Sequence, residues 1–395
     1  MLTYITYGIL QLPWWGYLVA TLILTQITIF CVTVFLHRSQ SHRAVDLHPI
    51  SSHFFRFWLW MTTGMVTKEW VAIHRKHHSK VETAEDPHSP QVKGIRKVLW
   101  EGAELYRKEA RNQETLERYG TGTPDDWMER NVYTRHSAMG ITLMLIINVV
   151  LFGIPGITIW AIQMAWIPLF AAGVINGIAH YWGYRNFECQ DASRNITPIA
   201  FFIGGEELHN NHHTYGTSAK FSVKWWEVDV GWGLIRLLQF FGLAKPKRVP
   251  PKAKLLPGKL SIDADTIKAV VTNRFQIMAQ YSKNVILPVL REERRRAGEA
   301  GRSMLSHMRT LLIRETSLVN PDKQQQLETV LEKHQNLGVV YQYRLKLQNI
   351  WARSTASQKE LVEALQEWCR QAEATGIEVL RDFVKHLKSY VPQQA

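Results

Sequence analysis

Three long apolar runs limit what this chain can fold into more than any other feature of its sequence. They occupy residues 14–36, 137–154 and 157–182, and each is long and apolar enough to cross a bilayer as a helix. The rest of the chain is markedly more polar. We therefore predict an all-α integral membrane protein with about three transmembrane helices plus interfacial helices.

Two shorter apolar stretches suit the membrane surface better than its interior. Residues 54–67 are too few to span a bilayer and include Arg56. Residues 221–243 have an amphipathic pattern, and we expect them to lie at the interface as well. Pro155 and Gly156 separate the last two long runs and predict a turn, so those runs should form a hairpin.

The composition changes near residue 245. The first 245 residues carry 22 Lys and Arg against 19 Asp and Glu, whereas residues 246–395 carry 25 against 15. This basic excess suits anionic lipid, nucleic acid or an acidic partner protein. We divide the chain into a membrane domain at 1–245, a Pro- and Lys-rich linker at 246–261 and a soluble, basic helical region at 262–395.

Histidine is concentrated in the membrane domain, where 13 of the chain's 16 histidines lie before residue 214. Three clusters, HRSQSH, HRKHH and HNNHH, account for eight of them. The pattern His-x-x-His-His occurs twice, and on a helix these three positions share one face, so each triplet can direct three imidazoles at one point. The eight cluster histidines are His37, His42, His74, His77, His78, His209, His212 and His213.

The first cluster does not fit a regular α-helix. His37 and His42 are five residues apart, a step that does not return to the same face, so we expect the helix to loosen or end there. The segment NGIAH adds Asn176 and His180 four residues apart. Nine imidazoles are too many for one ion but suit two, and imidazole binds iron, zinc, copper or nickel.

A shared metal site requires all three clusters to lie on the same side of the membrane. Residues 43–73, between the first and second clusters, must then cross an even number of times, most simply not at all. Residues 79–208 cross twice through the predicted hairpin. Because the basic tail and the loops that carry Lys and Arg lie on this side, we expect the site to face the cytoplasm.

Together these motifs resemble the membrane fatty acid desaturases, specifically the delta-9 type that acts on acyl-CoA or acyl-lipid. The likeness rests on the three ordered clusters, on EDPHSP after the second, on GGEEL before the third, and on NGIAH and WWEVDVGWGLIRLLQFFGLA. It covers about residues 14–245. The His-x4-His spacing of the first cluster favours desaturases over the related hydroxylases, which usually have His-x3-His.

The resemblance implies a centre of two iron ions that uses O2 to convert a saturated acyl chain to a cis monounsaturated one at the delta-9 position. The implied ligands are the eight cluster histidines and His180, with Asn176 reaching one iron through water. Zinc is excluded on this interpretation because it has no redox chemistry. The protein is then a multi-pass membrane protein, in the inner or plasma membrane if its source is bacterial.

Metal-bound histidines need hydrogen-bond acceptors behind them. The acyl chain also needs a dry slot beside the metals, and Trp, Phe and Gly residues near 58–70 and 176–187 are candidates to line it. His88 in DPHSP is open to either a ligand or a packing role. The candidate acceptors are Glu69, Asp86, Glu206, Glu207 and Asp229.

The reaction needs two electrons, and the sequence has no haem-attachment motif, no GxGxxG unit and no ferredoxin-type cysteines. We therefore expect a separate ferredoxin- or cytochrome-type donor with its reductase, docked by exposed Lys and Arg. Two alternatives stay open, namely a membrane hydroxylase of acyl chains or alkanes on the same scaffold, and a metal-bearing membrane adaptor that acts through its basic tail. CoA, phospholipid and carrier protein all remain open as acyl carriers.

The C-terminal third lies outside this pattern. Residues 341–390 weakly resemble the helical portion of certain transposases, but they hold no complete acidic triad, so that activity is not carried over. The region is interpreted as a helical module that packs or oligomerises, a docking module for a protein or lipid surface, or a nucleic-acid-binding module. We do not expect nucleic acid as a partner, because the run REERRRAG is typical of a solvated helix face.

Overall fold

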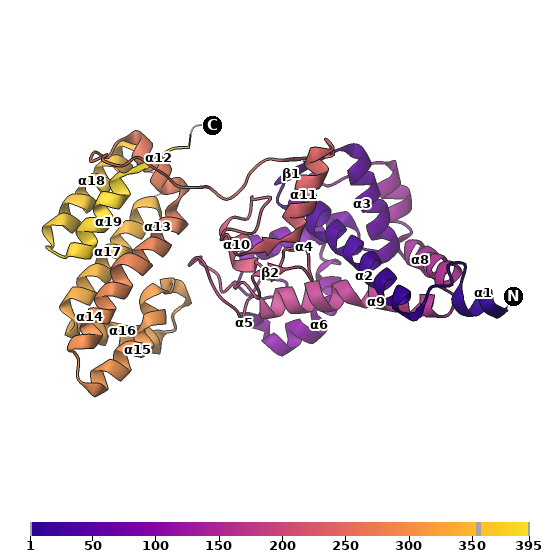
Figure 1. Cartoon of the computed structure of the whole chain (residues 1–395), viewed down its shortest axis with the longest axis horizontal. Helices are drawn as coiled ribbons and strands as arrows, with labels where there is room; N and C mark the ends of the chain where they lie inside the picture. The colour runs from indigo at the N-terminus through magenta and orange to yellow at the C-terminus, as the bar shows by residue number, and fades with distance from the viewer. Residues whose placement is uncertain (1, 353–356, 394–395) are drawn as a thin grey trace. The chain divides into compact units, whose positions relative to one another are not determined.

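The computed structural model describes residues 2–352 and 357–393, which belong to two compact units (Figure 1). Unit 1 comprises Met1–Arg185 and Asp191–Pro250, and unit 2 comprises Asn186–Gln190 and Pro251–Ala395. Both are helical, and the strands in the described residues form three two-stranded sheets. Each unit has its own core and is described separately.

Unit 1 contains α-helices and, unusually, three π-helical segments, labelled η. Its two small sheets pair β1 (Val45–Leu47) with β4 (Ala244–Pro246) antiparallel and β2 (Ile199–Ala200) with β3 (Val228–Asp229) in parallel. The helices are α1 (Leu2–Tyr7), α2 (Trp14–Phe30), η1 (Cys31–Ser41), α3 (Pro49–Thr62), α4 (Thr67–Lys80), α5 (Pro90–Lys93), α6 (Ile95–Glu109), α7 (Gln113–Tyr119), η2 (Glu129–Tyr133), α8 (Ser137–Phe152), α9 (Pro155–Trp166), η3 (Ile167–Ile178), α10 (His209–Thr214) and α11 (Val230–Phe240).

Two continuous helical segments of unit 1 are long and apolar enough to cross a membrane. They are Trp14–Ser41, which joins α2 to η1, and Pro155–Ile178, which joins α9 to η3, with 28 and 24 residues. The remaining predicted span, residues 137–154, forms α8, whose 16 residues reach only about 24 Å at 1.5 Å per residue. The number of membrane crossings therefore stays a prediction.

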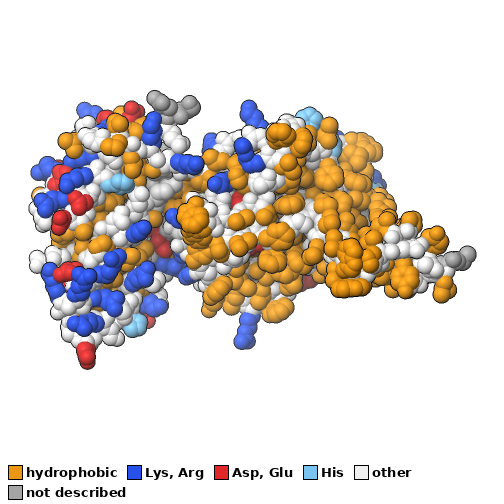
Figure 2. Space-filling view, in the orientation of Figure 1, with side chains coloured by type: hydrophobic (Ala, Val, Ile, Leu, Met, Phe, Trp, Pro, Cys, Tyr) orange, Lys and Arg blue, Asp and Glu red, His pale blue; other side chains and the backbone are white. Residues whose placement is uncertain are grey.

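Apolar side chains cover much of the outer surface of these helices (Figure 2). On α2, the side chains of Trp14, Leu18 and Leu22 are each more than half exposed. Ile146 on α8 and Ile157 on α9 are each about half exposed. A water-soluble protein rarely exposes such a continuous apolar area. This surface supports the association of unit 1 with a membrane.

The arginine in the short apolar stretch has a structural explanation. Arg56 lies on α3, which corresponds to the predicted interfacial segment, and its side chain is buried. Its guanidinium donates to both oxygens of Asp126 at 2.6 and 2.8 Å and to Glu129 at 2.9 Å. This ion-pair network attaches α3 to η2, just before the hairpin of α8 and α9.

Unit 2 is a bundle of helices around one apolar cluster that includes Ile277, Leu312, Leu347 and Phe383. Its strands β5 (Lys254–Leu255) and β6 (Tyr390–Val391) pair antiparallel, so they bring the two ends of the unit together. The helices are α12 (Ala264–Thr272), α13 (Arg274–Tyr281), η4 (Ser282–Ile286), α14 (Leu287–Arg296), α15 (Glu299–Ile313), the 3₁₀ turn η5 (Thr316–Leu318), α16 (Pro321–Lys333), α17 (Gln335–Ala352), α18 (Gln358–Ala374) and α19 (Glu378–Lys388).

Candidate metal centre

The helix that carries the first histidine cluster loosens, as its five-residue spacing predicts. From Cys31 to Ser41 the backbone is π-helical, and the amide of His42 donates to the carbonyl of His37 at 3.1 Å. A π-helix bonds each residue to the one five positions back, so it places the two imidazoles on one face. Their ring centroids are 4.9 Å apart.

The other clusters lie on regular helices. His74, His77 and His78 occupy α4, and the third cluster forms the six-residue helix α10. His180 follows η3, whose last turn places it next to His209 of α10. Four separate elements of unit 1 thus deliver nine imidazoles to one region.

The nine histidines form two groups in which the possible ligand atoms lie within 4.8 Å of one another. Site A consists of His37, His42, His74, His78 and His212, and site B consists of His77, His180, His209 and His213.

Within these sites, imidazole nitrogens face each other at short distances. The Nε2 atoms of His42 and His74 are 2.8 Å apart, those of His78 and His212 2.9 Å, and those of His180 and His209 3.0 Å. Two imidazole nitrogens bound to one ion at about 2.1 Å and at right angles would be about 3 Å apart. The spacing and the all-imidazole donors therefore fit a pair of transition-metal ions.

Burial keeps His42 and His213 in the neutral form that binds metals. It lowers the pKa of His42 to about 3 and that of His213 to about 4, and neighbouring imidazoles add to the shift. The Asp191 carboxylate acts in the opposite direction on His213 without reversing the effect. Neutral imidazole is a metal ligand over the whole pH range above these values.

Four carboxylates lie behind the histidines. Glu206 contacts Nδ1 of His37 at 2.7 Å, and Asp86 contacts Nδ1 of His77 at 3.0 Å. An acceptor on Nδ1 fixes the ring and leaves Nε2 to face the metal. Consistent with this, Nε2 of His77 is buried and has no hydrogen-bond partner among the described residues.

The same role falls to two carboxylates that the sequence did not single out. Glu82 contacts Nδ1 of His180 at 3.0 Å, and Asp191 contacts Nδ1 of His213 at 3.1 Å. Neither follows a recognisable motif, and Glu82 adopts a left-handed backbone, with φ of 63°, that sequence patterns rarely reveal.

The remaining candidate acceptors have other partners or positions. Glu207 accepts from the backbone amide of Ile203 at 2.9 Å, which fixes the loop before α10. Glu69 lines the cavity beside the histidines, and burial raises its pKa. Neither contacts an imidazole among the described residues, so the prediction of an acceptor role is supported for Asp86 and Glu206 but not for these two.

Asp229 instead holds the arginine next to box one, the His37–His42 segment. Arg38 is fully buried and pairs with Asp229 at 2.9 Å, while it also donates to the carbonyls of Gly204 and Ala219. Gly231 leaves room for the guanidinium, because a Cβ there would lie 2.9 Å from its Nη2 atom. This network joins η1 to the segments on either side of α10.

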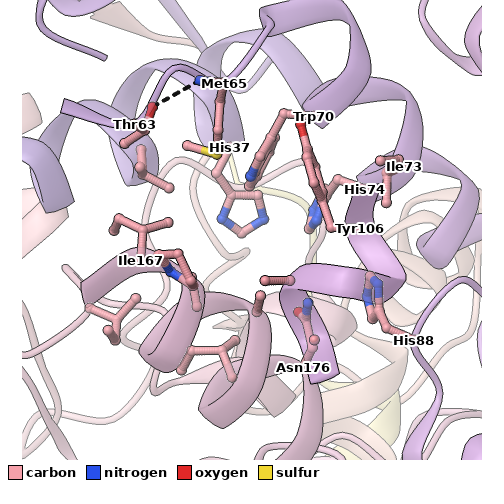
Figure 3. Close-up of a pocket in the computed structure, with 18 of the residues that line it drawn as sticks. His37, Thr63, Met65, Trp70, Ile73, His74, His88, Tyr106, Ile167 and Asn176 are labelled. Carbon is pink, nitrogen blue, oxygen red and sulfur yellow. Dashed lines mark hydrogen bonds between the residues drawn. The ribbon is translucent and has the colours of Figure 1, made fainter. Parts of the chain in front are cut away.

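A cavity of about 320 Å³ opens beside site A (Figure 3). His37, Trp70 and His74 line one side, and Asn176 projects from η3 on another. Of the Trp, Phe and Gly residues predicted to line it, Gly64 and Trp70 from 58–70 do so, whereas 176–187 contributes Asn176 and no residue of these three types. His88 also lines the cavity, and its ring lies 4.3 Å from that of His77.

The sequence did not identify the helix that closes this cavity. α6 supplies Gly102 and Tyr106 to its wall, and its backbone lies directly against η3. A Cβ on Gly102 would lie 2.3 Å from the carbonyl oxygen of Ala172, so only glycine permits this close crossing. α6 lies in a stretch rich in charged residues, so its composition gives no sign that it lines a mostly apolar cavity.

Comparison with known families accounts for both units. Residues 12–232, more than half of the chain, match the family described as fatty acid desaturase. The chain therefore belongs to the fatty acid desaturase family, whose members are O2-dependent oxidoreductases. Residues 266–393, in unit 2, match a family described as transposase, which confirms the resemblance of the C-terminal third.

Three relatives indicate the range of this family. A probable chloroplastic lipid desaturase of Arabidopsis thaliana is 30% identical over 57% of this chain, which spans 62% of that relative's length. An sn-1 stearoyl-lipid 9-desaturase of Synechocystis sp. is 30% identical over 57% of the chain and 69% of its own length. An acyl-CoA C20 delta-5 desaturase of Anemone leveillei is 30% identical over 56% of the chain and 70% of its own length.

Proposed function

We propose that this chain is a membrane desaturase that converts a saturated acyl chain, linked to a lipid or to CoA, to a cis monounsaturated chain at the delta-9 position. The observation that carries this proposal is the pair of adjoining all-histidine sites next to a mostly apolar cavity. The names of the relatives support an acyl substrate, and several of them, including the Synechocystis enzyme, support the position of the double bond.

The proposed cofactor is a pair of iron ions, one in site A and one in site B. Iron supplies the redox chemistry with O2 that removal of hydrogen from an unactivated methylene requires. The proposed ligands are the nine histidines of the two sites, with Asn176 as a further contact through water. Glu206, Asp86, Glu82 and Asp191 orient His37, His77, His180 and His213 through their Nδ1 atoms.

The cavity has the features needed to hold an acyl chain beside these sites. Its walls include Val32, Met65, Ile167 and Ile175, which exclude water and contact methylene groups. Met65 and Trp70 lie close to His37 in Figure 3. A chain held here by apolar contacts presents a fixed C–C bond to site A, which is how positioning sets the site of reaction.

The remaining assignments complete the proposal. Residues 1–245 form the catalytic membrane domain, with its active site facing the cytoplasm, residues 246–261 form the linker and residues 262–395 form a soluble helical region. Electrons arrive from a separate ferredoxin- or cytochrome-type donor and its reductase. Unit 2 is proposed as a packing or docking module without catalytic function.

Fatty acid profiling tests this function. We would express the full chain, His213→Ala and His53→Ala in host cells with a competent electron donor, and locate double bonds by gas chromatography–mass spectrometry. His53 is an exposed histidine outside both sites, so its variant is the matched control. The unmodified chain and His53→Ala should form a cis monoene that requires O2, and His213→Ala should reduce it at least about 100-fold because a metal ligand is lost.

Other products would change the conclusion. A hydroxylated acyl chain would identify a hydroxylase on the same scaffold. If well-expressed, iron-loaded protein formed no new product, acyl chemistry would be rejected in favour of an adaptor that acts through its basic tail.

A further inference from the structure

A second concave site lies on unit 1, just after box one, and the metal centre does not use it. This polar cleft has a volume of about 270 Å³ and is framed by the turn after η1, strand β1, the start of α3 and the turn at Gly122. Its polar walls are formed by Ser39, Gln40, Arg43, Asp46, Ser52 and Lys247. Their hydroxyl, amide, carboxylate and cationic groups differ sharply from the mostly apolar lining of the cavity beside site A.

The charges in this cleft are unbalanced. Lys247 pairs with Asp46 at 2.6 Å, and both side chains remain partly exposed. In the part of the chain that the structure describes, no carboxylate forms an ion pair with Arg43, whose contact is a long hydrogen bond of 3.4 Å to the carbonyl of Thr121. The cleft therefore has one cation in excess, together with neutral groups that donate hydrogen bonds.

The backbone of Arg43 is held in an unfavourable conformation. Its φ is +50°, in the left-handed region that glycine and asparagine tolerate better than a long side chain does. The guanidinium lies against Gly122, where a Cβ would be 2.3 Å from Nη2. Strain of this kind at a polar concave site is a common feature of ligand-binding positions.

A neighbouring arginine fixes the two walls of the cleft. Arg75 donates to the carbonyls of Gln40 and Ser41 on one wall and to those of Tyr119 and Thr121 on the other. Arg75 is thus fully engaged with backbone, and it holds the walls at a set separation before any ligand arrives. Preorganised walls reduce the entropy lost on binding.

From this geometry we propose that the polar cleft is a phosphate-binding site. Arg43 and Lys247 contact the phosphate oxygens, and Ser39, Gln40 and Ser52 supply hydrogen-bond donors. The shared ligand chemistry is a phosphate group, carried either by the headgroup of an anionic phospholipid or by a soluble phosphoester such as coenzyme A. The site goes beyond the desaturase function and does not depend on it.

Binding to the purified full chain in a neutral detergent tests the proposal. The probes are inorganic phosphate, coenzyme A and the soluble lipid dihexanoyl phosphatidylglycerol, each titrated by isothermal calorimetry. The variants are Arg43→Gln and Lys247→Gln, which remove one charge each. Lys245→Gln is the matched control, because Lys245 lies on β4 beside Asp46 but outside the cleft.

We expect at least one probe to bind. Each cleft variant should raise the Kd of that probe about tenfold, because one exposed charge-assisted contact is lost, and Lys245→Gln should leave the Kd unchanged. Preference for coenzyme A or for the lipid identifies the source of the phosphate. Circular dichroism and metal content verify folding, and Lys247→Gln tests the site alone if Arg43→Gln misfolds.

Three results would overturn the proposal. They are the absence of binding by all probes, an equal loss in Lys245→Gln, or unchanged binding in properly folded cleft variants. The assay needs no turnover, so a failure of desaturation would reject the proposed function and leave this site standing.

Discussion

Units 1 and 2 are both helical, yet they bury different kinds of side chain. Unit 2 is built on one continuous apolar cluster. Unit 1 has several smaller apolar clusters and fills the space between them with histidines, carboxylates and arginines. The polar residues buried in the described part of unit 2 are Thr266, Asn273, Ser282 and Arg344.

This difference shows where each unit derives its stability. Burial of apolar area stabilises unit 2, and it tolerates changes that preserve volume and pattern. Buried polar groups in unit 1 must each have a partner, since an unpaired one costs several kcal/mol. In unit 1 the same residues therefore shape both the fold and the metal centre, whereas unit 2 has no such link.

Two buried arginines provide the sharpest test of this contrast. Arg38 pairs with Asp229 in unit 1, whereas Arg344 in unit 2 donates to the carbonyls of Ile313 and Arg314. Arg38→Met leaves a buried carboxylate without its cation, so unit 1 should lose about 3–5 kcal/mol of unfolding free energy. Arg344→Met removes hydrogen bonds to backbone and a distant cation–π contact with Tyr341 but leaves no carboxylate unpaired, so unit 2 should lose less than about 2 kcal/mol.

Urea titration followed by hydrogen exchange and mass spectrometry measures the unfolding free energy of each unit separately, from the peptides that belong to it. Metal content measured in parallel should fall for Arg38→Met, because η1 loses its attachment to the segments around α10, and should stay constant for Arg344→Met. Equal losses of free energy in the two variants would contradict the contrast.

Acid should destabilise unit 1 more than unit 2, by a smaller difference than the two arginine variants produce. In metal-free protein the pKa of His42 is about 3 and that of His213 about 4, below the ordinary value of 6.5. As the pH falls below 6.5, these histidines bind protons in the unfolded chain before they do so in the folded chain. Their contribution to the stability of unit 1 is therefore complete above pH 6.5 and is lost as the pH falls to about 4 for His213 and about 3 for His42. In unit 2, burial lowers the pKa of His386, which is only partly buried, so its dependence should be shallower.

Hydrogen exchange of the metal-free chain at pH 7, 5.5 and 4.5 measures this difference. Peptides from α4 and α10 should lose protection before peptides from α17 and α18. Loss of protection in both units at the same pH would show that buried histidines do not set the acid response. Loaded metal should delay the change, because proton and metal compete for the same nitrogens.

The smallest expected effect is confined to one helix end in unit 2. Asp263 caps α12, its side chain accepts from the amide of Thr266 at 2.7 Å, and it pairs with Lys259. Asp263→Ala should lower the unfolding free energy of unit 2 by about 1 kcal/mol, the usual cost of a lost N-cap. Thermal unfolding measures this loss of free energy. Asp265→Ala, two residues further along in the first turn of the same helix, serves as the control.

Much of the metal centre was predictable because its signals are local. The two His-x-x-His-His triplets lie on helices that the structure brings together, and the five-residue step from His37 to His42 indicated a loosened helix. The desaturase family and the likeness of the C-terminal third to transposases are also confirmed. Each histidine signal lies within a few consecutive residues, whereas the two family resemblances rest on longer stretches, about residues 14–245 and 341–390.

What escaped prediction depends on contacts between distant segments. Glu82 reaches His180 across 98 positions, and no spacing rule connects them. Gly102 permits α6 to cross η3 at backbone contact, but an isolated glycine in a charged stretch gives no sign of such a partner. Sequence patterns thus identified the histidines that gather in sites A and B, and only the folded chain revealed what orients them and what encloses the cavity.

The π-helix η1 also limits how the length of the Trp14–Ser41 span can change during evolution. A π segment carries more residues per turn than an α-helix, so deleting one residue between Cys31 and Leu36 would let the backbone relax toward ordinary α-helical bonding. The apolar span would survive almost intact. Yet one residue corresponds to a rotation of about 100°, which would turn the outer part of the span relative to its histidines. Insertions and deletions that a membrane would accept would therefore displace His37 and His42 from the proposed metal sites, so the histidines constrain the length of this span at one end.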